Sequence, residues 1–183
     1  MTPEEFNACF DRFTTSVFRL EARQHYTVPD EDADMHLWQQ GHPLPDRSVR
    51  TSPWLRRIAV TTAAGKYWSR VHLVDLPLSP YLEFEFAGYL ENAAAGEEIR
   101  VAIRRDHPEM AELQEDFWLF DGGTPDAYGL TMQYDDDGRY VGSDLVTDPD
   151  RLAEYQKARE MAWTAAMPLN AFMARSASHW HAS

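Results

Sequence analysis

The fold is decided by the stretch SPYLEFEFAGYLENAAAGEEIRVAI, residues 79–103. Ser79 followed by Pro80 is typical of a helix start, because serine caps free backbone N–H groups and proline fits the first helical position. Gly96 predicts the end of this helix, since glycine adopts the left-handed conformation that often follows one. The alternation from Ile99 to Ile103 then predicts a half-buried strand.

The predicted helix has one apolar stripe, which includes Leu82, Phe86 and Tyr89 at helical spacing. Glu85 lies at the edge of this stripe, between Leu82 and Tyr89. A carboxyl group at the edge of an apolar surface can act as an acid or base, because burial raises its pKa. We therefore take Glu85 as the candidate acid/base and Tyr89 as a second proton donor.

Further strands are predicted at residues 117–120, 128–134 and 139–146, the last two joined by a turn that ends in Asp137-Gly138. Trp118, on the first of these strands, is a candidate ligand contact. Asp148 followed by Pro149 then predicts the start of a long C-terminal helix.

Arg159 lies in the middle of the apolar face of that last helix, one turn from both Tyr155 and Trp163. An unpaired buried guanidinium costs several kcal/mol, so it needs a carboxylate or a wet pocket. We predict that Arg159 meets Glu85, or that both line one ligand pocket with the neighbouring aromatic residues. A purely structural ion pair, or an arginine that reaches the surface, remains the alternative.

Two segments earlier in the chain also alternate. Residues 17–26 place Arg19 and Glu21 on one face of a strand, and these two are candidate ligand contacts, although such a row is more often a solvated sheet face. Residues 55–62 and 67–76 are predicted to form a hairpin, an exposed basic edge that would allow a homodimer.

The composition excludes several classes of function. The chain has 183 residues and a net charge of −13, which argues against direct nucleic-acid binding and against an anionic membrane surface. The acidic start without an apolar segment, and the lack of any membrane-spanning run, predict a cytoplasmic protein. One cysteine and scattered histidines predict no metal site, and no cofactor motif is present.

Residues 1–173 are predicted to form a single α+β domain, and residues 174–183 a disordered polar tail. The expected core is a mixed, mostly antiparallel sheet of six or seven strands packed against helices, with the long C-terminal helix across it.

Several short segments carry a resemblance in their order and spacing: FDRF (10–13), FRLE (18–21), YLEFE (81–85), AGEEIRV (95–101), DFWLFD (116–121), YDDDGR (134–139) and the closing residues 155–169. On these segments the chain resembles DUF6879, an actinobacterial family of unknown function. The resemblance implies an actinobacterial, cytoplasmic protein linked to helix-turn-helix regulators or to secondary metabolism, and it carries over no catalytic residues. The later part of the chain is also similar to the sensor region of XRE-type regulators.

Two hypotheses follow for function. The first is an accessory module that binds a small molecule or a helix-turn-helix regulator protein, because aromatic residues and arginine dominate binding sites. The second is a small cofactor-free biosynthetic enzyme, a cyclase, isomerase or lyase, that uses Glu85 as acid/base and Arg159 as an anion clamp.

Overall fold

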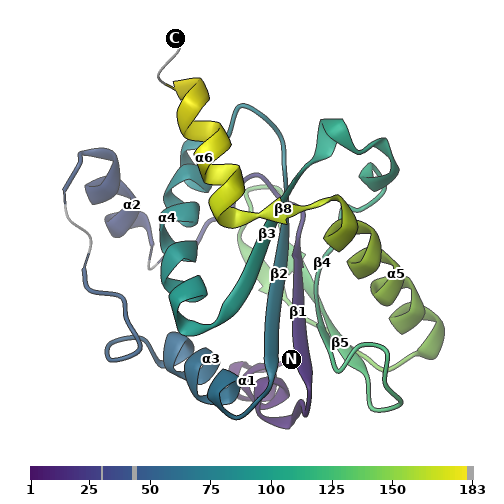
Figure 1. Ribbon diagram of the computed structural model, residues 1–183. Helices are drawn as coiled ribbons and strands as arrows, with labels where there is room; N and C mark the ends of the chain where they lie inside the picture. Colours follow the sequence, from purple (N-terminus) through teal and green to yellow (C-terminus); the bar gives the residue numbers. More distant parts are fainter. Residues whose placement is uncertain (30, 43–44, 181–183) are drawn as a thin grey trace.

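Helices cover both faces of one twisted sheet in the computed structural model, which describes residues 1–29, 31–42 and 45–180 (Figure 1). Two 3₁₀ turns, η1 and η2, lie between the third and fourth strands. The helices are α1 (Pro3–Arg12), α2 (Asp32–Gln39), α3 (Pro53–Ala63), α4 (Pro80–Ala95), α5 (Pro149–Ala165) and α6 (Leu169–Trp180).

The sheet is mixed, and in the described part of the chain it has eight strands in the order β6-β5-β4-β1-β2-β3-β8, with β7 beside β5. The β1–β2 and β2–β3 pairs are parallel and the other pairs are antiparallel. This confirms the α+β class, with more strands than predicted. The strands are β1 (Ser16–Glu21), β2 (Tyr67–Val74), β3 (Glu97–Ile103), β4 (Asp116–Phe120), β5 (Tyr128–Tyr134), β6 (Tyr140–Gly142), β7 (Leu145–Val146) and β8 (Met167–Pro168).

The predicted helix starts are confirmed at both main helices. The Ser79 hydroxyl accepts a hydrogen bond from the Leu82 backbone N–H at 3.1 Å, and Gly96 ends α4 with a left-handed φ of 115°. At α5 the Asp148 carboxylate accepts from the Arg151 N–H at 2.9 Å.

The two faces of the sheet have different partners. Phe18 and Leu20 of β1 pack with Tyr155 and Ala162 of α5 on one face. On the other face, α4 and α6 pack over β2 and β3, while α1 and α3 pack over the opposite end of the strands. Helices α4 and α5 therefore lie on opposite sides of the sheet, as Figure 1 shows.

The predicted hairpin at residues 55–76 is wrong in its first half. Residues 53–63 form helix α3, with Ser52 capping the Leu55 N–H and Pro53 in the first turn. Leu55 and Ile58 are its buried residues, at helical spacing. Strand β2 is consequently central rather than an exposed edge, because it lies between two parallel neighbours.

The C-terminal region also differs from the expectation of one long closing helix. Helix α5 ends at Ala165, the short strand β8 pairs with β3, and α6 then continues to Trp180. The predicted tail, residues 174–183, overlaps α6, and its last three residues lie outside the described residues. Among the described helices, none is long and apolar enough to cross a bilayer.

Candidate functional site

The site begins with the register of the two central strands. Arg19 of β1 pairs with Arg70 of β2, and Glu21 pairs with His72. Alternation turns all four side chains to the face that α4 covers. They are 0–6% exposed, so the predicted solvated face is wrong. The charges are buried because β1 lies in the middle of the sheet and α4 closes over it.

Three of these side chains belong to a buried ion network, which we define as Arg19, Glu21, Arg70, Glu97 and Asp116. Arg70 bridges two carboxylates, with its Nη1 2.7 Å from Glu21 and its Nε 2.9 Å from Glu97. Arg19 Nη2 lies 2.9 Å from Asp116, and its Nε lies 3.4 Å from Glu21. Burial raises the pKa of Glu21, but the adjacent Arg70 and Arg19 outweigh it and hold that pKa well below its usual range.

Glu85 stands apart from this network because, among the described residues, no arginine or lysine lies within 4.0 Å of its carboxyl group. Its buried Oε2 accepts no hydrogen bond, and the nearest ion-pair contact is His72 Nδ1 at 3.5 Å. Burial and the negative charge of Glu21 raise the pKa of Glu85 well above its ordinary value of 4.5. Glu85 is therefore a carboxyl group that retains its proton above the usual range.

Tyr89 and His72 connect Glu85 to the network. The Tyr89 hydroxyl donates to Glu21 at 2.5 Å and lies 2.8 Å from His72 Nδ1. His72 Nε2 lies 2.8 Å from the Arg23 carbonyl, so it carries the proton and donates to that oxygen. Burial lowers the pKa of His72. In this neutral imidazole the unprotonated Nδ1 lies 3.5 Å from Glu85 Oε2, where it can accept the proton that Glu85 retains.

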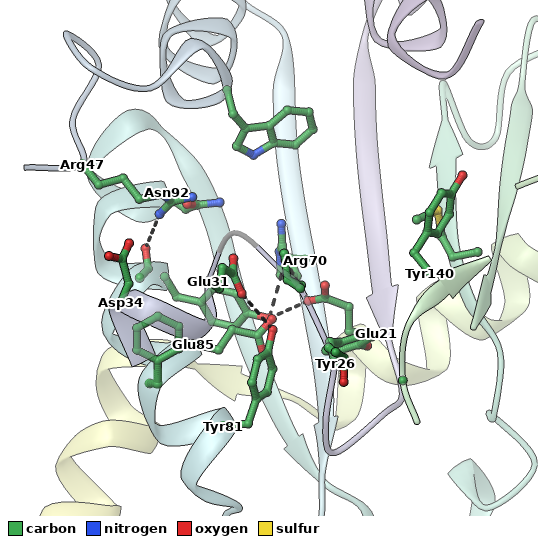
Figure 2. Close-up of a pocket in the computed structure, with 18 of the residues that line it drawn as sticks. Glu21, Tyr26, Glu31, Asp34, Arg47, Arg70, Tyr81, Glu85, Asn92 and Tyr140 are labelled. Atoms are coloured by element: carbon green, nitrogen blue, oxygen red, sulfur yellow. Dashed lines mark hydrogen bonds and ion pairs between the residues drawn. The ribbon is translucent and has the colours of Figure 1, made fainter. Parts of the chain in front are cut away.

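A cavity of about 640 Å³ opens above these groups, and Figure 2 shows the side chains that line it. Glu21, Arg70 and Glu85 contribute polar groups, and Arg47 forms an ion pair with Glu91 at 3.1 Å. Eight aromatic side chains also line the wall: Phe6, Tyr26, Trp54, Tyr81, Phe84, Tyr89, Tyr134 and Tyr140. The volume and this lining are typical of a small-molecule site.

A divalent cation is the other species that these residues could hold. Within the described chain, ligand atoms of Glu21, His72 and Glu85 lie within 4.8 Å of one another. The Nδ1 of His72 lies 3.7 Å from Glu21 and 3.5 Å from Glu85. However, the same Glu21 Oε2 already accepts from Arg70 at 2.7 Å and from Tyr89 at 2.5 Å. A metal would have to compete with a guanidinium, which makes this trio a poor resident metal site.

The structure brings five of the predicted site residues together. Glu21, Glu85 and Tyr89 line the cavity. Arg19 and Trp118 are buried on the same face of the sheet, where the Arg19 guanidinium lies 5.1 Å from the Trp118 ring centre.

The predicted pairing of Glu85 with Arg159 is wrong. Arg159 lies on α5, and its guanidinium is 5.8 Å from the ring centre of Phe18 on the opposite face of the sheet. Tyr155 stacks on Phe117 at 4.0 Å on that face, and Trp163 stacks under Arg100 at 4.1 Å. The sheet itself therefore separates these three residues from the cavity.

Sequence reasoning missed several residues of the site. Arg70 and His72 alternate with apolar residues, which was the available signal, but the hairpin prediction placed them on an exposed edge. Glu31 follows a proline-containing break, and its pKa is raised by burial despite a hydrogen bond from Tyr81. Glu97 and Asp116 stand at the starts of strands, where no local pattern distinguishes a buried acid from a solvated one.

The comparisons with known proteins give a family and no function. The sequence matches the family described as Domain of unknown function (DUF6879) over residues 4–174. No curated protein matches the chain.

Proposed function

The chain belongs to the DUF6879 family, and from the site we propose that it is a binding module for a small molecule, which enters the cavity beneath α4. One observation carries the proposal: the buried Oε2 of Glu85 has no hydrogen-bond partner and belongs to a side chain that lines an open cavity of about 640 Å³. Buried polar atoms in folded proteins are nearly always paired, so an unpaired one beside a cavity is available to a polar group of a ligand.

The surroundings of Glu85 support this function because they are rigid. Tyr89 lies one helical turn from Glu85, and its hydroxyl is held by the hydrogen bond that it donates to Glu21. Arg70 is fixed between two carboxylates. A site whose polar groups are already ordered loses little conformational entropy on binding, which favours affinity.

Stability alone is a poor explanation for the presence of the buried ion network. Replacing buried ion pairs by apolar residues is often neutral or stabilising, since desolvation offsets the electrostatic attraction. Charges at the floor of a cavity fit a binding role better than a structural one.

An enzyme is the second candidate, and one observation favours it. Glu85 Oε2 lies 3.5 Å from His72 Nδ1, and burial raises the pKa of the first group and lowers that of the second. The pKa values of Glu85 and His72 therefore approach each other, and a small difference in pKa favours proton transfer between the two groups. Glu85 would be the acid/base and Tyr89 a second donor, as in a cyclase, isomerase or lyase. Consumption of a bound compound by the wild type, but not by Glu85→Gln, would identify this activity.

The resemblance to the family suggests finer points, which we propose with the function: an actinobacterial, cytoplasmic protein that works beside a helix-turn-helix regulator or in secondary metabolism.

The test uses Gly88, which lines the cavity from α4. A Cβ at this position would meet only Arg47 Nη1, at 3.6 Å, so a methyl group fits and a longer side chain must extend into the cavity. We would screen a fragment library by ligand-observed NMR against the wild type, Gly88→Ala and Gly88→Met.

The proposal predicts hits that bind the wild type and Gly88→Ala and are lost in Gly88→Met. Hits that bind all three proteins equally, or a library without hits, would contradict it.

A further inference from the structure

We propose that the ligand is an organic amine in its cationic form, with the ammonium group between Glu85 and Glu31 and its apolar body against the aromatic wall. This inference rests on the proposed function and adds the chemical class of the ligand.

The first argument is the balance of charge around the cavity. Its arginines are already paired, Arg70 with Glu21 and Glu97, and Arg47 with Glu91. Glu31 and Glu85 also line the cavity, yet neither has an arginine or lysine within 4.0 Å in the described part of the chain. Among the described residues, Glu31 and Glu85 are therefore acids of the cavity wall that no arginine or lysine pairs with.

The second argument is that the two acids share one region. The Tyr81 hydroxyl donates to Glu31 at 3.3 Å, and the charges of both Glu31 and Glu85 act on Tyr81. The negative charge of Glu31 also disfavours the ionised form of Glu85. Figure 2 shows Glu31, Glu85 and Tyr81 converging in the same part of the cavity. A cation placed there pairs with the Glu31 carboxylate and favours the ionised form of Glu85.

The third argument comes from the aromatic wall. Trp54, Tyr81 and Phe84 line the cavity. The negative faces of aromatic rings attract organic cations, and their apolar area binds the body of a ligand. An amine with a hydrophobic body meets both properties of the wall.

Other ligand charges fit less well. An anion would face Glu31 and Glu85 and would have to break an existing arginine pair to be neutralised. A metal ion would bind deeper, at His72, and would leave the aromatic wall without a role. A neutral ligand would leave Glu31 without a cationic partner.

The experiment compares three probes that share a phenyl ring: phenethylamine (cationic), 2-phenylethanol (neutral) and phenylacetate (anionic). Affinities are measured by ¹H–¹⁵N NMR titration of the full chain at pH 7.5, which also maps the binding residues. The variants are Glu85→Gln, and Glu83→Gln as a control on the same helix, because Glu83 does not line the cavity. Thermal melting of each variant confirms that it is folded.

We expect phenethylamine to shift cavity resonances and to bind at least tenfold more tightly than 2-phenylethanol. Glu85→Gln should remove most of this preference, while Glu83→Gln keeps it. If the alcohol binds in the cavity as tightly as the amine, or phenylacetate binds more tightly, the cation inference is overturned and the binding function stands. If no probe reaches the cavity, both are overturned. A separate titration uses Zn²⁺ alone. If Zn²⁺ shifts the resonances of His72 and the amine does not bind, a metal ion replaces the amine as the inferred ligand.

Discussion

Replacing Glu85 by glutamine should make the protein more stable at neutral pH. The change keeps the shape of the side chain and removes its titratable proton, and the Oε2 of Glu85 has no hydrogen bond to lose. Because its pKa in the folded protein lies well above 4.5, Glu85 binds a proton more tightly folded than unfolded. The contribution of such a group to the free energy of unfolding is fully present below its pKa in the unfolded chain. This contribution is lost as the pH rises toward its pKa in the folded protein.

The size of the effect follows from this linkage. Each pH unit above 4.5 costs about 1.4 kcal/mol for as long as the folded protein keeps the proton. Between pH 5 and pH 7, two units, the wild type should therefore lose up to about 2.7 kcal/mol relative to Glu85→Gln. Comparing the two proteins at each pH largely cancels the titration of the groups that face Glu85, namely Glu21, Glu31, His72 and Tyr89.

The assay is urea denaturation of both proteins at pH 5, 6 and 7, with Glu83→Gln as the control. We expect the advantage of Glu85→Gln to grow by about 1–3 kcal/mol over this range. A constant difference, or a variant that is less stable than the wild type at pH 7, would refute the reasoning. Glu85 would then be ionised and paired with a protonated His72.

Three further predictions concern the ion network, the cavity and the ligand. Arg70→Met should destabilise the protein by about 3–5 kcal/mol in urea denaturation, because two carboxylates lose their shared cation. Adding Glu21→Gln should restore part of this loss. A cost of Arg70→Met under about 1 kcal/mol would contradict the prediction. Gly88→Met should raise stability by up to about 1 kcal/mol through helix propensity while it blocks ligands, so a destabilised variant would show that the cavity cannot take the side chain. Phenethylamine affinity, measured by calorimetry, should rise with pH from 5 to 7, because binding releases the Glu85 proton. The rise should be shallower for Glu85→Gln, in which only Glu31 still titrates at the site; a wild-type affinity that falls with pH would contradict the proposed proton release.

The helix ends and most of the strands could be predicted from the sequence, because their signals are local. Ser79 and Asp148 cap α4 and α5 as expected, and the Asp137-Gly138 turn has the left-handed glycine that it requires. The prediction failed at residues 53–63, where Ser52-Pro53 is the same helix-start signal as Ser79-Pro80 but residues 55–62 were predicted to form a strand. That error moved β2 from the centre of the sheet to its edge.

The site could be predicted only in part, because it depends on which face of the sheet each helix covers. Glu85 and Tyr89 stood out by their place on α4, and Arg19 and Glu21 by alternation on β1. Arg159 satisfied the same local rule on α5, yet it lies across the sheet. Periodicity places a residue on one face of its own element and carries no information about the element opposite.

The central claim is that Glu85 stands at the floor of a ligand site, and a crystal structure grown with phenethylamine tests it most directly. We predict electron density for the amine in the cavity, with its nitrogen about 3 Å from the Glu85 carboxylate, the distance of a charge-assisted hydrogen bond. An empty cavity, or an amine bound away from Glu85 at saturating concentration, would contradict the claim.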